Sequence, residues 1–215
     1  MRASVVAIPP PAPAPIAGQS RVPMSAQPAS VRLARPPRAG PLRERREAAL
    51  VRDAQRGSSD ALEELFRRHW RRAHRAAFLV VGDSTAAEDI AQESFLAAVR
   101  ALDRFDRRRP FGPWLHRIAV NRAIDFARAR ALRGEASLRE PAEGVEPDRD
   151  GLSDELRLAL LELTPEHRAV VVLRHLLGYT PGQIAEILDL PRGTVNSRLR
   201  RGLDRLRPEL ERGAP

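Results

Sequence analysis

The chain has 215 residues and a formal net charge of +9, and the 37 residues that carry its positive charge are all arginines. It contains no cysteine, which excludes disulfides, thiolate metal sites and thiol nucleophiles. No run approaches the ~18 apolar residues that a membrane span needs. The positive charge predicts a polyanionic partner, and these features together fit a cytoplasmic protein that does not insert into a membrane.

The N-terminal segment, residues 1–57, lacks hydrophobic periodicity and is rich in proline. Proline interrupts helix and sheet hydrogen bonding, and such a segment cannot bury enough apolar surface to offset the entropy of ordering it. We therefore expect a disordered Pro/Arg-rich extension over residues 1–57. A helix start near Leu42 is left open.

Three helices are predicted in residues 58–132, where apolar residues recur every three or four positions. Gly82 provides a C-terminal cap for the first, and Thr85 with Glu88 forms a capping box for the second. Pro113 suits the first turn of the third, which follows the loop DRFDRRRPFGP. The predicted helices cover about residues 60–81, 86–102 and 113–131.

An acidic stretch without periodicity, residues 133–152, predicts a flexible linker and a domain boundary. Four short helices are predicted in residues 153–212, because Thr-Pro pairs at 164–165 and 180–181 each give an N-cap followed by proline in the first turn. The expected fold class is therefore all-α, with a three-helix-type domain and a four-helix domain joined by the linker.

The last predicted helix has one apolar side and one side that is short or cationic. Small residues allow close approach to a major groove, Asn can pair with adenine and Arg with guanine, while arginines at the edges suit phosphates. A short helix over residues 181–188, a two-residue turn and this basic helix form a helix-turn-helix. A helical hairpin with a solvated cationic face is the alternative. The candidate DNA-contacting residues are Arg192, Thr194, Asn196, Ser197, Arg198, Arg200 and Arg201.

Two segments resemble conserved regions of bacterial RNA polymerase sigma factors of the sigma-70 family. The segment similar to region 4 is LTPEHRAVVVLRHLLGYTPGQIAEILDLPRGTVNSRLRRGLDRLR. The segment similar to region 2 is AAEDIAQESFLAAVRALDRFDRRRPFGPWLHRIAVNRAIDFARAR. The spacing between them leaves no room for a region 3 domain, so the resemblance is to the extracytoplasmic-function (ECF) subfamily. It implies a region 2 domain over residues 58–132 that binds core polymerase and the −10 element, and a region 4 domain over residues 153–212 that binds the −35 element.

The resemblance implies a sigma factor that directs promoter-specific initiation. Its implied partners are the clamp coiled coil and flap of core RNA polymerase, promoter DNA and, if one exists, an anti-sigma factor. We expect no cofactor and no enzymatic activity, because the five histidines are scattered, no ligand-spaced cluster joins them and no Gly-rich phosphate loop is present.

The second predicted helix carries the segment that docks on the clamp in such proteins. An acidic and amide surface can meet a basic helix, and complementary charge sets register and encounter rate. The alternative is that these acids only favour the start of a helix through its dipole. The resemblance implies polymerase-binding roles for Asp89, Gln92, Glu93 and Phe95.

The third helix and the loop before it, residues 103–112, resemble the part of the family that melts the −10 element and receives a flipped base. Bases outside the stack call for aromatic faces, amides and cations. Trp114 as an ordinary core aromatic, and the arginine run as a solvated loop, are the alternatives. The candidate −10 residues are Arg107, Arg108, Arg109, Trp114, Arg117, Asn121 and Arg122.

The sequence departs from the common family pattern at Pro110 and Pro113, which stiffen the loop, and at Asn196 and Arg200, which leave the −35 preference open. Two other readings stay open. One is a stand-alone helix-turn-helix regulator whose residues 58–131 sense a signal or dimerise. The other is a protein-interaction module that binds an antagonist as a decoy and has no promoter activity.

Overall fold

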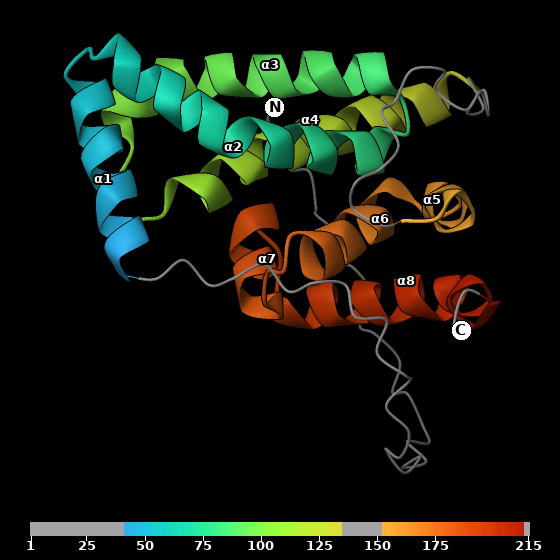
Figure 1. The fold of residues 1–215 in the computed structure, drawn as a ribbon. Coiled ribbons are helices and arrows are strands. Elements are labelled where there is room, and N and C mark those ends of the chain that lie inside the picture. The colour runs from blue at the N-terminus through green and yellow to red at the C-terminus, as the bar shows by residue number, and fades with distance from the viewer. Residues whose placement is uncertain (1–40, 135–151, 213–215) are drawn as a thin grey trace, which may run out of the picture. The chain divides into compact units, whose positions relative to one another are not determined.

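The computed structural model describes residues 41–134 and 152–212, and each regular element in these two ranges is a helix (Figure 1). Residues 41–134 form α1 (Pro41–Gln55), α2 (Ser59–Val81), α3 (Ser84–Ala101), the short η1 (Leu102–Arg104) and α4 (Phe111–Leu132). Residues 152–212 form α5 (Asp154–Leu161), α6 (Pro165–Val171), the π-helical turn η2 (Val172–Leu176), α7 (Pro181–Leu188) and α8 (Arg192–Arg212). The predicted all-α fold is confirmed, while most of the predicted linker lies outside the described residues.

Disorder over residues 41–55 is contradicted by the helix α1, which agrees with the helix start near Leu42 that the sequence left open. Val51 and Ala54 of α1 are 1% and 6% exposed and join a core with Leu65 of α2. The helix is therefore ordered by packing in a core that also holds Phe111 and Leu115 of α4, which a local search for apolar periodicity does not detect. The rest of the predicted extension, residues 1–40, lies outside the described residues.

The α2–α3–α4 group packs closely because small residues occupy its helix contacts. Ala73, Ala76 and Ala77 of α2 are fully buried, as are Ala87 and Ala91 of α3, all at 0% exposure. α1 runs across one end of this group (Figure 1). The group is thus a compact platform that fixes where the loop between α3 and α4 begins and ends.

Two helix starts differ from the sequence prediction. Asp83, and not Thr85, is the N-cap of α3, and its side chain accepts a hydrogen bond from the Ala86 N–H at 2.9 Å. α4 begins at Phe111, two residues before Pro113. Both differences lie at helix ends, where several residues compete to cap the same N–H groups.

The helix-turn-helix is present in α7 and α8. α7 opens with a capping box between Thr180 and Gln183, and it ends at Asp189, whose φ of 55° is left-handed. Asp189 is the one non-glycine residue with positive φ among the described residues. Short polar side chains tolerate this conformation, so the turn leads the chain into α8 within three residues, one more than predicted.

We expect Asp189→Val to lower the free energy of unfolding by about 1–2 kcal/mol, because a β-branched residue is strained at positive φ. Asp189→Gly should stay within about 1 kcal/mol of the wild type, since glycine adopts this φ freely. Urea unfolding of the full chain, followed by circular dichroism, measures both. Equal stability of the valine variant and the wild type would contradict a strained turn.

Candidate nucleic-acid interface

The exposed face of α8 carries the side chains that the sequence predicts for DNA contact. Val195, Leu199 and Leu206 are 0%, 8% and 2% exposed and form the buried face. On the other side, Arg192, Asn196, Arg200 and Arg201 are exposed, and Thr194, Ser197 and Arg198 are half-buried. Gly202 lies on the buried side, where a Cβ atom would stand 2.8 Å from Val171 Cγ2, so α8 passes α6 closely.

In the described part of the chain, the arginines at the start of α8 have no carboxylate partner, and the nearby Glu166 pairs with Arg128 instead. Within residues 41–134 and 152–212, none of Arg192, Arg198, Arg200 and Arg201 forms an ion pair. Farther along α8, by contrast, Arg207 pairs with Asp204 at 3.1 Å. The cationic end of the helix is therefore available to an external anion.

An open cavity of about 540 Å³ lies beside this face, between α6 and α8. His167 lines it and contacts Thr164, with 2.6 Å between His167 Nδ1 and Thr164 Oγ1. Burial lowers the pKa of His167, and the positive charges of Arg198 and Arg201 lower it further. The sequence analysis did not assign His167 a place in the interface. The cavity is lined by Glu166, His167, Gly193, Thr194, Ser197, Arg198 and Arg201.

Trp114 lies in an aromatic cluster at the N-terminal end of α4. Its ring centroid is 4.4 Å from that of Phe105, and its edge contact with Phe111 has a centroid distance of 5.6 Å. Phe105 and Phe111 are buried, whereas Trp114 is half-buried. Part of the Trp114 side chain therefore packs as an ordinary core aromatic, which was the alternative to a base-binding role.

The arginine loop between η1 and α4 is exposed at Arg107, Arg108 and Arg109. Asp106 accepts hydrogen bonds from the Arg108 backbone N–H and from Arg108 Nε, both at 3.0 Å. The Arg108 side chain and backbone lower the pKa of the Asp106 carboxyl. Of the three arginines, Arg108 is thus held within the loop.

The polar stripe of α4 meets the surface predicted to bind polymerase. Arg117, Asn121 and Arg122 are half-buried, and Arg122 Nη1 donates to Glu93 Oε2 of α3 at 2.5 Å. This pair joins one candidate −10 residue to one candidate polymerase residue. Asp89, Gln92 and Glu93 are exposed on α3, as the prediction requires.

Phe95 does not lie on the open surface of α3 with these three residues, and its predicted polymerase-binding role stays a prediction. It is 6% exposed and packs against Phe66, with ring centroids 4.8 Å apart. Instead it forms the floor of an open groove of about 640 Å³ between α2 and α3. The groove is lined by Leu62, Glu63, Phe66, Trp70, Glu88, Gln92, Phe95, Leu96 and Val99.

Three apolar side chains at this groove were missed by the sequence analysis. Phe66, Leu96 and Val99 are 41%, 55% and 46% exposed. Leu96 and Val99 stand one helical turn apart on α3, outside the stripe of α3 that packs on α4. The sequence signal that could have identified this surface is apolar residues outside the buried stripe of a helix, because an exposed apolar patch marks an interaction surface.

Neither a metal site nor a membrane span was found in the part of the chain that the structure describes. No group of three or more His, Asp or Glu side chains there could hold a metal ion. No helix there is both long enough and apolar enough to cross a bilayer.

Two family models match the chain, and each falls on one of the helical groups. Sigma-70 region 2 matches residues 65–133, and Sigma-70, region 4 matches residues 153–206. The chain is 32% identical over 177 residues to the ECF RNA polymerase sigma factor SigW of Bacillus subtilis, covering 74% of this chain and 94% of SigW. It is 36% identical over 168 residues to the ECF sigma factor SigM of Mycobacterium tuberculosis, covering 76% and 84% respectively.

Solved structures show a similar arrangement of helices. CnrH, solved in complex with the cytosolic domain of CnrY, has a TM-score of 0.60 at 29% identity, covering 78% of this chain and 99% of CnrH. RpoE of Bartonella quintana, solved with the anti-sigma factor NepR, has a TM-score of 0.61 at 22% identity, covering 71% and 98%, and supports the fold alone.

Phe95→Ala should lower the free energy of unfolding by about 3–5 kcal/mol, because it empties a buried aromatic position. Leu96→Ala, the neighbouring exposed position, should change it by less than about 1 kcal/mol. Urea unfolding of the full chain measures both. A small effect of Phe95→Ala would contradict a core role for this ring.

Proposed function

Because the chain belongs to the ECF subfamily of sigma-70 family sigma factors, it directs promoter-specific transcription initiation by RNA polymerase, and we propose how its helices divide this work. In this proposal α8 binds the −35 element, the arginine loop with α4 binds and melts the −10 element, and the α2–α3 groove docks on the polymerase clamp. Sigma factors are not enzymes, so the chemistry of RNA synthesis belongs to the polymerase. A stand-alone regulator is not favoured, since both family regions are present in order.

The observation that carries the −35 proposal is the exposed cationic face of α8. Its small residues Gly193, Thr194 and Ser197 allow the helix to approach the floor of a major groove. Arg200 and Arg201 have the bidentate geometry that reads guanine, and Asn196 can pair with adenine. Arg192 and Arg198, together with the cavity beside His167, suit the flanking phosphates.

For the −10 element, the proposal uses the arginine loop and the polar stripe of α4. Arg107 and Arg109 are exposed cations that can follow a single-stranded backbone, with Arg108 held on Asp106. Trp114 offers the exposed part of its ring at the edge of the aromatic cluster, where an unstacked base could pack. Asn121 and the cations of Arg117 and Arg122 extend this surface along α4.

For polymerase binding, the proposal combines the predicted acidic residues with the groove that the structure adds. Phe66, Leu96 and Val99 form an apolar strip, Glu63 and Glu88 line the same groove, and Asp89 is exposed next to Glu88 in the chain. An amphipathic helix with basic flanks complements such a surface, and a clamp coiled coil offers that chemistry. The region 4 domain would contact the flap.

Location and regulation follow from these partners. We propose that the chain acts in the cytoplasm, where core polymerase and promoter DNA are found. An anti-sigma factor is a further proposed partner, since the related CnrH was solved with the cytosolic domain of CnrY bound to it.

Reconstitution tests the proposed function directly. The purified full chain, mixed with core polymerase and a library of genomic fragments, should yield discrete run-off transcripts that core polymerase alone does not make. The same chain should co-elute with core polymerase. If the mixture never initiates at defined sites, the proposed division of work fails at its first step.

Arg200→Ala and Arg201→Ala should each weaken binding to a mapped −35 duplex by about tenfold, since a bidentate base contact contributes about 1–3 kcal/mol. Arg207→Ala is the matched control, because Arg207 lies on the same helix but is already paired with Asp204. Holoenzyme binding is measured by fluorescence anisotropy at two salt concentrations. Wild-type transcription by both variants would show that the face is assigned wrongly.

Leu96→Glu should weaken binding to core polymerase by at least about tenfold, because it places a charge in the apolar strip of the groove. Leu132→Glu is the control, since Leu132 is 89% exposed at the end of α4 and lies outside the groove. Affinity for core polymerase is measured by biolayer interferometry. Equal affinities of the two variants would exclude the groove as the docking surface.

A further inference from the structure

α1 is anchored to both ends of the arginine loop through polar side chains. At one end, Gln55 Nε2 donates to the backbone oxygens of Leu102 and Phe105, at 2.8 Å and 3.0 Å. At the other end, Glu47 Oε1 accepts from the backbone N–H of Phe111 at 3.0 Å. Two side chains on one helix thus bind the backbone where the loop departs from α3 and where it enters α4.

The anchor at Phe111 meets a need of α4 itself. The first N–H groups of a helix lack intrahelical partners, and Pro110 at the N-cap of α4 has no side chain that could accept from them. The Glu47 carboxylate supplies the missing acceptor from α1, at the positive end of the α4 dipole. Glu47 is therefore a cap for α4 contributed by another helix.

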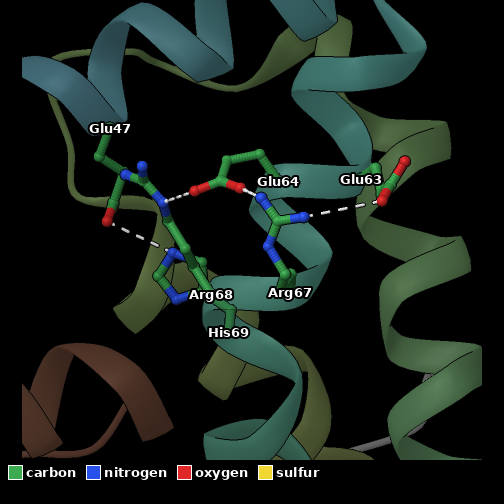
Figure 2. Close-up of polar contacts among 6 residues, drawn as sticks. All are labelled: Glu47, Glu63, Glu64, Arg67, Arg68 and His69. Carbon is green, nitrogen blue, oxygen red and sulfur yellow. Dashed lines mark hydrogen bonds and ion pairs between the residues drawn. The ribbon is translucent and has the colours of Figure 1, made fainter.

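The Glu47 carboxylate is also placed by His69 of α2. Its Oε2 atom lies 3.3 Å from His69 Nε2, and Figure 2 shows Glu47 reaching from α1 toward the His69 ring. Burial acts to raise the pKa of Glu47, but the contact with His69 and the N–H groups of Phe111 and Gly112 outweigh it, so the pKa lies below the usual value. Glu47 is thus held as a carboxylate, which is the better acceptor.

The first turn of α4 sits directly on the same histidine. A Cβ atom at Gly112 would lie 3.3 Å from His69 Cε1 and 3.4 Å from His69 Nδ1, so the backbone of α4 approaches the ring closely. The rings of Phe105 and Phe111 meet edge to face, with centroids 5.9 Å apart, and bring the two ends of the loop together. The loop is consequently short, closed at its base and fixed to α1 and α2.

Inside the loop, few contacts determine its shape. Asp106 accepts from the Arg108 backbone N–H, and its carbonyl accepts from the Arg109 backbone N–H at 2.9 Å. The side chains of Arg107, Arg108 and Arg109 are exposed. The position of the loop is therefore fixed at its two ends, while inside it Arg108 is also held on Asp106.

We propose that Glu47 and Gln55 are positioning residues for promoter melting, which fix both ends of the arginine loop so that its cations meet the unpaired −10 strand. This inference rests on the proposed function, because it assigns α1 a role in the same step. Neither residue touches DNA in the proposal. Each acts through the backbone of the loop.

The competing explanation is that α1 only stabilises the domain, as its buried Val51 does. The variants Glu47→Ala and Gln55→Ala remove the anchors. Val51→Ala is the matched control for stability, since it opens the α1 core contact and leaves both anchors in place. Glu64→Gln is the control for charge, because Glu64 pairs with Arg67 and Arg68 on its own helix (Figure 2).

The test uses holoenzyme made from full-length chains and core polymerase, on a promoter mapped by run-off transcription. Three quantities are measured: affinity for core polymerase, affinity of holoenzyme for a single-stranded oligonucleotide with the non-template −10 sequence, and permanganate reactivity of −10 thymines on duplex promoter. We expect Glu47→Ala and Gln55→Ala to weaken oligonucleotide binding by about tenfold, which matches the loss of one charge-assisted hydrogen bond at Glu47 or two neutral ones at Gln55. Core affinity should stay at the wild-type value.

Glu47→Gln should retain more −10 binding than Glu47→Ala, because its amide oxygen can still accept from the Phe111 N–H. Should Glu47→Ala lose core binding, Gln55→Ala carries the test, since it removes no charge. Wild-type −10 binding by both alanine variants overturns the inference, as does an equal loss in Val51→Ala or a parallel loss of core binding in both variants. If wild-type holoenzyme itself opens no promoter, the proposed function fails together with the inference.

Discussion

The arrangement of the N-terminal half of this sigma factor depends on how the first N–H group of α4 finds a hydrogen-bond acceptor, because no residue next to it in the chain supplies one. Pro110 precedes the helix and Pro113 lies in its first turn, so the start of α4 has no local side-chain acceptor. Glu47 of α1 satisfies the Phe111 N–H, and His69 of α2 holds the carboxylate in place. The consecutive helices α1 and α2 meet α4, which is distant from them in sequence, at this point. The path of the loop between α3 and α4 follows from it.

Hydrogen-bond and ion-pair partners distinguish the buried Arg168 from the arginines that we propose bind DNA. Arg168 is 6% exposed and donates to the Leu161 and Leu163 carbonyls at 2.6 Å and 2.8 Å, so it serves the fold of the region 4 domain. Its burial lowers its pKa to about 10, which still leaves it charged at neutral pH. The arginines at the start of α8 have no carboxylate partner among the described residues, and those of the loop are exposed. An arginine without a carboxylate partner at the surface attracts an external anion more strongly than a paired one.

The two candidate DNA surfaces differ in how they are made. On α8 a regular helix presents its residues by periodicity alone, with Val195 and Leu199 buried on the other side. The −10 surface is assembled from a loop, the polar stripe of α4 and an aromatic cluster in which Trp114 packs on Phe105. A surface of the first kind tolerates change in its neighbours. A surface built on a loop depends on contacts that hold the ends of the loop, because a short loop has little internal structure.

The sequence by itself determined the helical class, the two groups of helices, the helix-turn-helix and the exposed face of α8, because these follow from hydrophobic periods and caps within a few residues of each other. The positions of Arg192 to Arg201 could be assigned in this way. Only the tertiary structure decided that α1 is a helix, that Phe95 is buried under an apolar groove edged by Leu96 and Val99, and that Glu47 caps α4. Each of these depends on contacts between residues far apart in the chain, such as Glu47 with Phe111, and a local pattern carries no record of which distant group will satisfy a buried N–H or cover an apolar ring.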